Sequence, residues 1–257
     1  MRKKKKPLLL LFDADMLVYQ MCAIAETEIE WERDLWTLHS DANEVKAALD
    51  DKVQAITNLV LDHLNYEGAY EILMCFSCDE GNFRQTQVLS TYKLNRQGKR
   101  KPLAYYGVKK WVKENYNCYQ KDTLEADDCI GILATLNPNN AVIISGDKDF
   151  KTIPCFCLYN YGKHEFSKVT EEEADYNFYK QTLTGDTADG YGGCKGIGAV
   201  GAAKILDKEC SWGVVLQAFV KAGYSPEQAL QQARCARILR KTDYDFKNKK
   251  AKLWQPS

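Results

Sequence analysis

Carboxylates recur at the ends of apolar runs in this chain, where they could bind divalent cations. Asp13 closes the apolar run of residues 8–12, and Asp79 follows the run of residues 72–76 after two intervening residues. The other carboxylates of interest open a predicted helix, follow a third apolar run or precede a glycine-rich stretch. They are Glu125, Asp127, Asp128, Asp147, Asp149, Asp186 and Asp189.

These carboxylates share a chemistry if the chain folds as an open α/β sheet, because strand ends on one edge then meet at one crevice. Two carboxylates at ~4 Å repel each other by roughly 1–4 kcal/mol. They stay ionised together when a multivalent cation lies between them. An oxygen-only ligand set suits Mg²⁺ or Mn²⁺. We therefore interpret the set as the metal site of an enzyme that acts on phosphate esters.

Single pairs of these acids have simpler interpretations. Glu125 and Asp128 share one face of a helix, but acids in a first helical turn are also ordinary capping residues. Asp147 and Asp149 point to the same side of an extended chain, but they would also suit a turn. The joint placement of all the pairs favours the metal site over capping and turns.

The distribution of charge is more informative than the net charge, which is zero. Residues 81–113 contain no acid, whereas residues 26–51 are rich in acids. The bases of this segment are Arg84, Lys93, Arg96, Lys99, Arg100, Lys101, Lys109, Lys110 and Lys113. A basic segment beside a metal site is typical of proteins that bind a polyanion. The alternative is a solvated basic surface.

Periodicity predicts an α/β protein. Apolar runs predict strands at residues 8–12, 71–76, 141–145 and 155–159. Apolar stripes predict helices at 50–64 and 124–136, the second capped by Thr123 and stopped by Asn137-Pro138. This alternation predicts a mostly parallel central sheet with helices on both faces. The basic segment has no strong period and contains glycine and proline, so we expect it to be partly mobile.

The chain changes to helices near residue 165, so we expect an α/β domain at 1–165 and a helical lobe at 166–257. Helices are predicted at 171–184, 199–207, 212–221 and 225–240, the last capped by Ser225. No stretch approaches the ~20 apolar residues of a membrane span. The N-terminal residues do not form a secretory signal, and most cysteines lie in apolar runs. We expect a reduced, cytoplasmic protein that does not contact membranes.

Residues 196–201 match the pattern GxGxxG, but no strand precedes them, as a dinucleotide site requires. A hairpin between two helices fits better. Its glycines allow close approach to a phosphate, and the next helix presents N–H groups to it. Lys195 and Lys204 add positive charge, so we expect sequence-independent binding of a nucleic-acid backbone.

Parts of the sequence also fit two other functions. Asp13-Ala14-Asp15 after a strand resembles the nucleophile motif of haloacid-dehalogenase-type phosphatases. That interpretation leaves the glycine hairpin, the basic segment and the acids at 125–128 unexplained. A DNA-binding protein without activity is the non-enzymatic alternative, and it is disfavoured because unneeded acids repel DNA.

Several motifs in this order resemble the flap endonuclease / 5′→3′ exonuclease family. They are Phe83-Arg84, the residues 92–96 (YKLNR), 124–128 (LEADD), 145–150 (SGDKDF), 185–190 (GDTADG) and 193–198 (GCKGIG). Residues 236–240 and 253–256 further resemble the exonucleases of short-tailed bacteriophages. The resemblance implies a PIN-like α/β domain, a basic arch at 81–113 and a helix–hairpin–helix lobe.

The resemblance also implies roles for single residues. The first metal ion would be held by Asp13, Asp79, Glu125 and Asp127, with Asp128 beside them and Asp15 as a further candidate. The second would be held by Asp147, Asp149, Asp186 and Asp189. Catalytic cations would be Lys93, Arg96 and Arg84. Contacts to DNA would come from Lys99, Arg100, Lys101, Lys195, Gly196, Gly198 and Lys204, with a K⁺ ion at the hairpin 193–198.

The implied activity is hydrolysis of phosphodiesters in duplex DNA with two Mg²⁺ ions, or with Mn²⁺ as a substitute. The substrate would carry a 5′ end or a flap, and the products would carry 5′ phosphates. The balance of exonuclease and flap cutting and the use of RNA–DNA hybrids stay open. The expected role is phage DNA replication or host DNA breakdown, by a monomer in the host cytoplasm.

Overall fold

The apolar run at residues 8–12 forms the inner strand β1 (Leu8–Asp13) of a six-stranded sheet. We describe a computed structural model, which places residues 6–256. β1 pairs in parallel with β4 (Tyr70–Cys75) and β6 (Ala141–Ser145). The strand order is β5-β4-β1-β6-β7-β8, and only the last pair is antiparallel. The other strands are β5 (Cys118–Tyr119), β7 (Cys155–Asn160) and β8 (Glu165–Val169).

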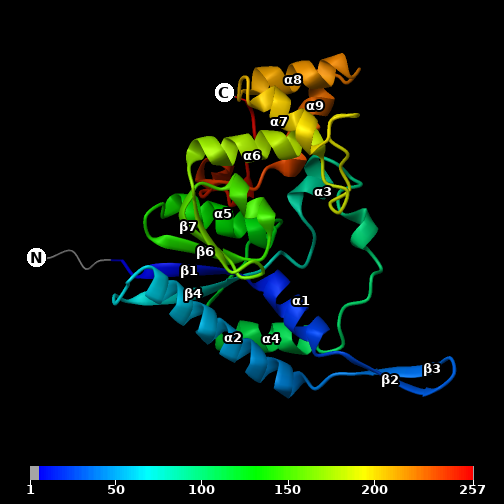
Figure 1. Cartoon of the computed structure of the whole chain (residues 1–257), viewed down its shortest axis with the longest axis vertical. Coiled ribbons are helices and arrows are strands. Elements are labelled where there is room, and N and C mark those ends of the chain that lie inside the picture. Colours follow the sequence, from blue (N-terminus) through cyan, green and yellow to red (C-terminus); the bar gives the residue numbers. More distant parts are fainter. Residues whose placement is uncertain (1–5, 257) are drawn as a thin grey trace, which may run out of the picture.

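Helices cover both faces of this sheet (Figure 1), because the residues of β1 alternate between two apolar cores. Leu8, Leu10 and Phe12 pack in the core that contains residues of α1, α2 and α4. Leu11 packs in the core that contains residues of α5. These helices are α1 (Ala14–Ile24), α2 (Ala42–His63), α4 (Tyr105–Asn115) and α5 (Ala126–Leu136). The predicted mostly parallel α/β sheet is confirmed.

Four C-terminal helices gather beyond one end of the sheet (Figure 1) and share a third apolar core, which includes Leu183, Val215 and Phe219. They are α6 (Glu171–Thr184), α7 (Ala199–Leu206), α8 (Trp212–Lys221) and α9 (Pro226–Ala236). After α9 the chain returns to the α/β part of the protein, where the short strands β9 (Tyr244–Asp245) and β10 (Lys250–Ala251) form a separate two-stranded sheet. No helix within residues 6–256 is long and apolar enough to cross a membrane.

The predicted helices at 171–184 and 212–221 have the observed bounds, but other ends were wrong. Thr123 does not cap α5, because its backbone is left-handed with a φ of 63°. Glu125 is the cap instead. Helix α9 begins after Ser225 as predicted but ends at Ala236 rather than near residue 240, and α2 begins eight residues before the predicted start.

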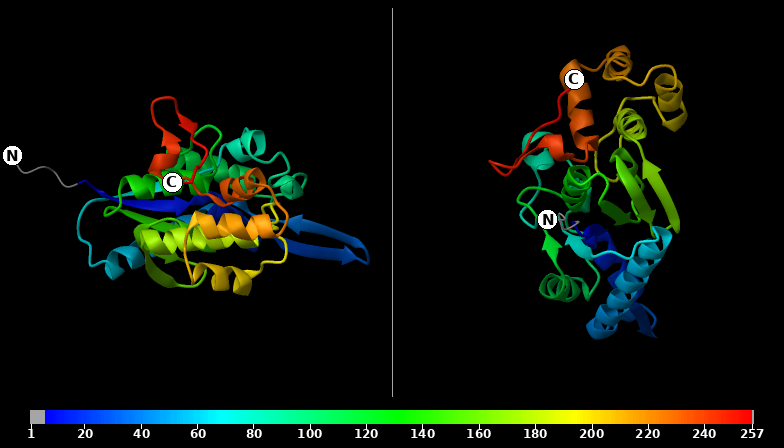
Figure 2. Two further views of the ribbon diagram at one scale, coloured as in Figure 1. Left: turned by 90° about the horizontal axis from the view of Figure 1, so that it is seen from above. Right: turned by 90° about the vertical axis from the view of Figure 1, so that its left-hand side faces the viewer.

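Two elements were not predicted. The basic segment, in which no helix was predicted, contains α3 (Phe83–Gln87), a short 3₁₀ turn at Leu94–Arg96, and α4. The residues of α4 that point inward, among them Val108 and Val112, are fully buried. An exposed hairpin of β2 (Thr27–Glu32) and β3 (Leu35–His39) projects away from the sheet (Figures 1 and 2).

The C-terminal segment after α9 packs directly on α5, and a glycine makes this possible. A Cβ atom on Gly131 would lie 2.4 Å from the carbonyl oxygen of Leu239 and 3.0 Å from the side chains of Ile153 and Ile238. The backbone N–H of Lys241 donates a hydrogen bond of 2.8 Å to Thr135 Oγ1 in the same helix. The side of α5 opposite the sheet is therefore sealed by residues more than one hundred positions away.

We expect Gly131→Ala to destabilise the protein by about 1–3 kcal/mol, because the new methyl group would overlap backbone. Gly107→Ala is the matched control, since this glycine lies in α4 with open space around its Cα and should gain up to about 1 kcal/mol of helix propensity. Chemical denaturation of both variants measures the difference. Equal stabilities would show that the C-terminal segment does not pack tightly on α5.

Candidate active site

Two neighbouring parallel strands bring the first carboxylates together. Asp13 is the last residue of β1 and caps α1, where Met16 N donates to its Oδ1 at 3.2 Å. Ser145, the last residue of β6, donates from Oγ to Asp13 Oδ2 at 2.8 Å. The backbone N–H of Asp147 donates to the same Ser145 Oγ at 3.0 Å. The Ser145 hydroxyl therefore links the carboxyl ends of β1 and β6 to the backbone of Asp147.

Asp13 is buried, and Asp147 and Asp149 are half-buried. Burial raises the pKa of Asp13 to about 6, and the neighbouring Asp15 and Asp147 act in the same direction. Burial, followed by the repulsion of Asp147, also raises the pKa of Asp149 to about 6. Among residues 6–256, no Lys, Arg or His forms an ion pair with Asp13, Asp147 or Asp149. A bound cation would relieve this repulsion.

A second group of carboxylates lies at the start of α5. Oxygens of Glu125, Asp127 and Asp128 lie within 4.8 Å of one another. Burial and the charges of Asp128 and Glu125 raise the pKa of Asp127 well above its usual range. Burial opposes the ionisation of Glu125 too, but Lys93 and Arg84 outweigh it and lower the pKa of Glu125. The ionised form of Asp127 is therefore disfavoured here, and a cation beside it would favour that form.

Within this group, Asp128 forms a buried ion pair with Arg84. Arg84 donates from Nη1 to Asp128 Oδ2 at 2.7 Å and from Nη2 to Oδ1 at 2.8 Å. Arg84 Nη1 also donates to Glu125 Oε2 at 2.9 Å, and the backbone N–H of Leu239 donates to Asp128 Oδ1 at 3.0 Å. The side chains of Arg84 and Asp128 are only 1% and 0% exposed. Neither side chain can reach a substrate in this arrangement.

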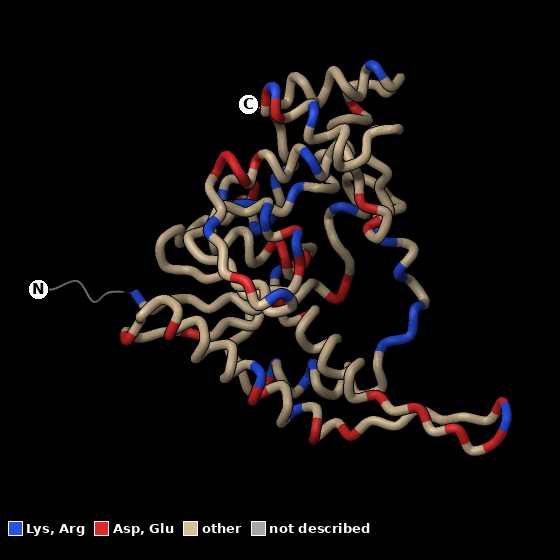
Figure 3. Tube along the Cα trace, viewed as in Figure 1, with Lys and Arg blue, Asp and Glu red and all other residues tan. Residues whose placement is uncertain are grey.

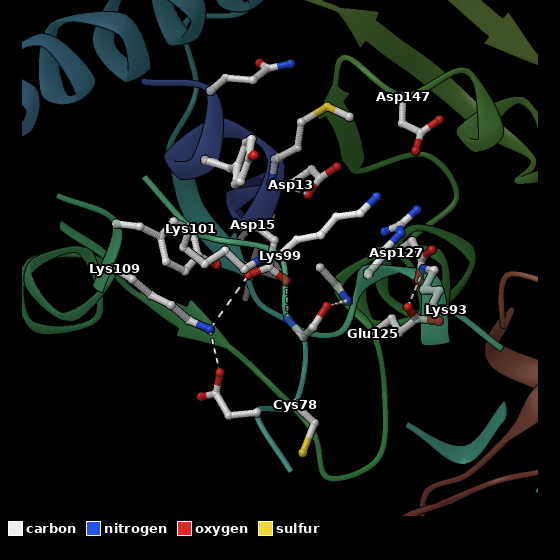
Figure 4. Close-up of a pocket in the computed structure, with 18 of the residues that line it drawn as sticks. Asp13, Asp15, Cys78, Lys93, Lys99, Lys101, Lys109, Glu125, Asp127 and Asp147 are labelled. Atoms are coloured by element: carbon white, nitrogen blue, oxygen red, sulfur yellow. Dashed lines mark hydrogen bonds and ion pairs between the residues drawn. The ribbon is translucent and has the colours of Figure 1, made fainter. Parts of the chain in front are cut away.

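The carboxylates and the basic segment line one cavity of about 780 Å³ (Figure 4). Of the predicted metal ligands, the cavity brings together Asp13, Asp79, Glu125, Asp127, Asp147 and Asp149. Of the predicted cations, it brings together Lys93, Arg96, Lys99, Arg100 and Lys101. Its lining does not include Arg84, Asp128, Asp186 or Asp189. Acids from four separate parts of the chain therefore face basic residues of a fifth.

Lys93 and Arg96 join the basic segment to the acids. Lys93 Nζ lies 2.5 Å from Glu125 Oε1 and 3.5 Å from Asp189 Oδ2, and Arg96 Nη2 lies 2.5 Å from Asp189 Oδ1. The backbone N–H of Lys93 donates to the carbonyl of Asp189 at 2.9 Å. Asp186 is occupied within its own turn, where it accepts hydrogen bonds from the backbone N–H groups of Ala188 and Asp189.

Asp79 lies at the edge of the cavity, with its side chain 61% exposed. Partial burial opposes its ionisation, but hydrogen bonds from Lys109 at 2.6 Å and Lys113 at 3.1 Å lower the pKa of Asp79 to about 2. Asp15 lines the cavity as well and accepts a hydrogen bond of 2.8 Å from Ser77 N. The sequence places Lys109 in the basic segment, but no pattern in it predicts the contact of Lys109 with Asp79.

The glycine hairpin at 193–198 lies apart from this cavity. Lys195, Gly196, Gly198 and Lys204 are exposed, and none of them lines the cavity. Gly196 has a φ of 82°, and a Cβ atom on Gly196 or Gly198 would meet nothing within 4 Å. The hairpin therefore presents open backbone next to the N-terminus of α7.

The mostly parallel sheet, with carboxylates at the carboxyl ends of its strands, has the architecture of the PIN-like nucleases. The model of the 5′-3′ exonuclease N-terminal resolvase-like domain matches residues 9–177. The exonuclease of Escherichia phage T7 is 31% identical, over 96% of this chain and 93% of that protein. The chain belongs to the flap endonuclease / 5′→3′ exonuclease family and is a hydrolase.

Solved structures show the same fold at low sequence identity. The 5′-exonuclease of phage T5 with bound zinc has a TM-score of 0.65 at 14% identity, and 90% of this chain and 89% of that chain are covered. A complex of the T5 flap endonuclease with DNA and metal ions has a TM-score of 0.62 at 12% identity, with the same coverage. These matches confirm the predicted PIN-like architecture.

Arg84→Met should destabilise the protein by about 3–5 kcal/mol, because it leaves the carboxylate of Asp128 buried without a cation. Lys110→Met is the matched control: that side chain is 77% exposed, so its loss should change stability by less than about 0.5 kcal/mol. Denaturant unfolding compares the two variants. If Arg84→Met were as mild as its control, the buried ion pair would not support the acidic group.

Proposed function

We propose that this protein is a metal-dependent 5′→3′ exonuclease and structure-specific flap endonuclease that hydrolyses phosphodiesters of duplex DNA. The observation that carries the proposal is the joining of buried, repelling carboxylates and a basic segment in one cavity. The acids suit metal ions, and the bases suit a phosphate backbone. The T5 flap endonuclease, which shares the fold, was solved with both DNA and metal ions.

The ligand set fits Mg²⁺, with Mn²⁺ as a substitute, because every available donor is a carboxylate oxygen. We propose that Asp13, Asp79, Glu125 and Asp127 hold one ion, and that Asp147, Asp149, Asp186 and Asp189 hold the other. Asp13, Asp127 and Asp149 carry raised pKa values, so a divalent cation would stabilise their ionised forms. Asp186 and Asp189 would join the site through movement of their turn.

The chain itself would bind and orient the scissile phosphate. Lys93 and Arg96 lie at the acidic side of the cavity, where they can neutralise charge that builds on the phosphate. Such electrostatic stabilisation is often worth about 3 kcal/mol of the barrier. When bound, the two metal ions would supply an activated water and a partner for the leaving 3′ oxygen. Arg84, a predicted catalytic residue, would act by holding Glu125 through the buried ion pair.

DNA binding would use two surfaces. Lys99 and Lys101 line the cavity and would contact the 5′ strand. The exposed hairpin at 193–198, with Lys195, Gly196, Gly198 and Lys204, would bind the duplex backbone, with a K⁺ ion held by its carbonyls. Residues 166–257 would thus act as a helix–hairpin–helix lobe beside the nuclease domain.

We further propose a monomer that serves phage DNA replication or host DNA breakdown in the host cytoplasm.

The function is tested with 5′-labelled duplex, flap and RNA–DNA hybrid substrates. We expect Mg²⁺-dependent release of 5′-phosphorylated mononucleotides or short oligomers, and complete loss of cleavage with a chelator. The product ladder measures exonuclease against flap cutting, and the hybrid reports whether RNA is accepted. Binding of DNA without cleavage in any divalent metal would instead indicate a binding protein. Turnover of small phosphomonoesters alone would indicate a phosphatase.

Asp147→Asn should abolish cleavage in Mg²⁺ and leave DNA affinity within a few-fold, because the substitution removes a metal ligand but no basic residue. Asp62→Asn, an exposed substitution on α2, is the matched control for a lost negative charge and should retain activity. Turnover and fluorescence anisotropy with labelled DNA measure the two effects. Full activity of Asp147→Asn would exclude this residue from the metal site.

A further inference from the structure

Two sets of contacts, one on each side of residues 97–99, hold the basic arch (residues 81–113) against the rest of the protein. On its N-terminal side, Asn95 Nδ2 donates to the carbonyls of Thr187 and Ala188 at 3.2 Å, and Arg96 pairs with Asp189. On its C-terminal side, the fastening residue is Glu26, which follows α1 and precedes the exposed hairpin. Two distant parts of the chain therefore hold the arch.

The carboxylate of Glu26 receives three hydrogen bonds from the arch. Arg100 donates from Nη1 to Oε1 at 2.7 Å and from Nη2 to Oε2 at 2.8 Å, and the backbone N–H of Leu103 donates to Oε1 at 2.5 Å. Bidentate pairs between arginine and carboxylate fix geometry as well as charge. The hydrogen bond from Arg100, followed by that from Leu103, lowers the pKa of Glu26 to about 2. Its side chain is only 11% exposed, unlike its neighbours in the hairpin.

Between these two sets of contacts lies a short exposed span with local backbone hydrogen bonds, in which Gln97 N donates to the carbonyl of Leu94 at 3.0 Å and Lys99 N to that of Arg96 at 3.4 Å. Gln97, Gly98 and Lys99 are exposed, and the side chains of Gln97 and Lys99 make no hydrogen bond within the described part of the chain. Gly98 has a φ of 74° and open space around its Cα. Figure 3 shows this basic span standing clear of the acidic centre of the molecule. After the span, Lys101 Nζ lies 5.4 Å from the ring of Tyr19, so the segment rests on α1 again.

We propose that Glu26 is a positioning residue, which holds Arg100 and Leu103 and thereby fixes the width of the opening between the arch and the acids. The charge of Arg100 is then used within the protein, and Arg100 supports the arch rather than binding phosphate. This inference rests on the proposed nuclease function only for its effect on substrates. A narrower or wider opening would change which 5′ structures reach the carboxylates.

An isolated surface ion pair contributes little and would not hold a segment in place. The Glu26 contact differs because a backbone N–H and a bidentate guanidinium meet on one largely shielded carboxylate. Loss of this carboxylate would free both the arginine side chain and the backbone that leads into α4. The span from residue 97 to residue 103 would then have one fastening in place of two.

Limited trypsin digestion of the full chain without DNA or metal tests the fastening directly. Glu26→Ala should be cut after Lys99 or Arg100 at least tenfold faster than the parent protein; the bond after Lys101 precedes Pro102 and resists trypsin. Glu30→Ala, in the hairpin that follows Glu26, removes an exposed carboxylate that makes no hydrogen bond or ion pair in the described residues, and it should be cut at the parent rate. Unchanged melting temperatures establish that both variants fold. Equal cutting of Glu26→Ala and the parent would overturn the proposal.

Kinetics on DNA test the consequence. Glu26→Ala and Arg100→Ala should each raise KM on flap substrates about fivefold with kcat within twofold, and the double variant should be no worse than either. Glu26→Asp should recover part of the loss. A residue that binds phosphate would lower the salt slope of DNA affinity by about one. Such a decrease of the salt slope in Arg100→Ala alone would overturn the proposal. If no variant cleaved DNA, the proposed nuclease function would be rejected, and trypsin digestion would still test the contact of Glu26 with the arch.

Discussion

Negative charge held out of water at the carboxyl edge of the sheet is the constraint on which the rest of the structure depends. Asp13 and Asp127 sit where burial disfavours their ionised forms. The protein offsets part of this cost locally, through the hydroxyl of Ser145 and the N-terminus of α5. The remaining charge is left for a cation to neutralise. A site with every acid already paired would bind no metal, so incomplete compensation is what makes the site useful.

The supporting charges come from distant parts of the chain. Arg84 in the basic segment neutralises Asp128 in α5, and the backbone of Leu239 completes the same carboxylate. Gly131 lets that C-terminal backbone approach α5 closely. The acids at the start of α5 therefore keep their geometry only while three separate segments remain packed together. Stability of the fold and geometry of the cavity are coupled at this point.

Local patterns in the sequence predicted the sheet well, but they did not predict helix α4 or the long-range ion pairs around the cavity. Apolar runs located β1 and β6, and the rule for parallel strands placed Asp13 beside the residues after β6. Helix α4 was missed because its lysines obscured a buried stripe that includes Val108. The burial of Arg84 and the contact of Glu26 with Arg100 depend on tertiary packing over 44 and 74 positions. No spacing in the sequence encodes such pairs.

The same packing changes what a count of basic residues means. The segment 81–113 reads as nine positive charges, but several of them already face an acid: Arg84 faces Asp128, Arg96 faces Asp189, and Arg100 faces Glu26. Each such pair carries little net charge. These arginines therefore orient groups around the cavity but do not attract a polyanion from a distance. In the proposed function, long-range attraction of DNA would come from exposed lysines such as Lys99. Because phosphate contacts that release counterions set the salt dependence of DNA binding, the number of free lysines, and not the total charge, determines that slope.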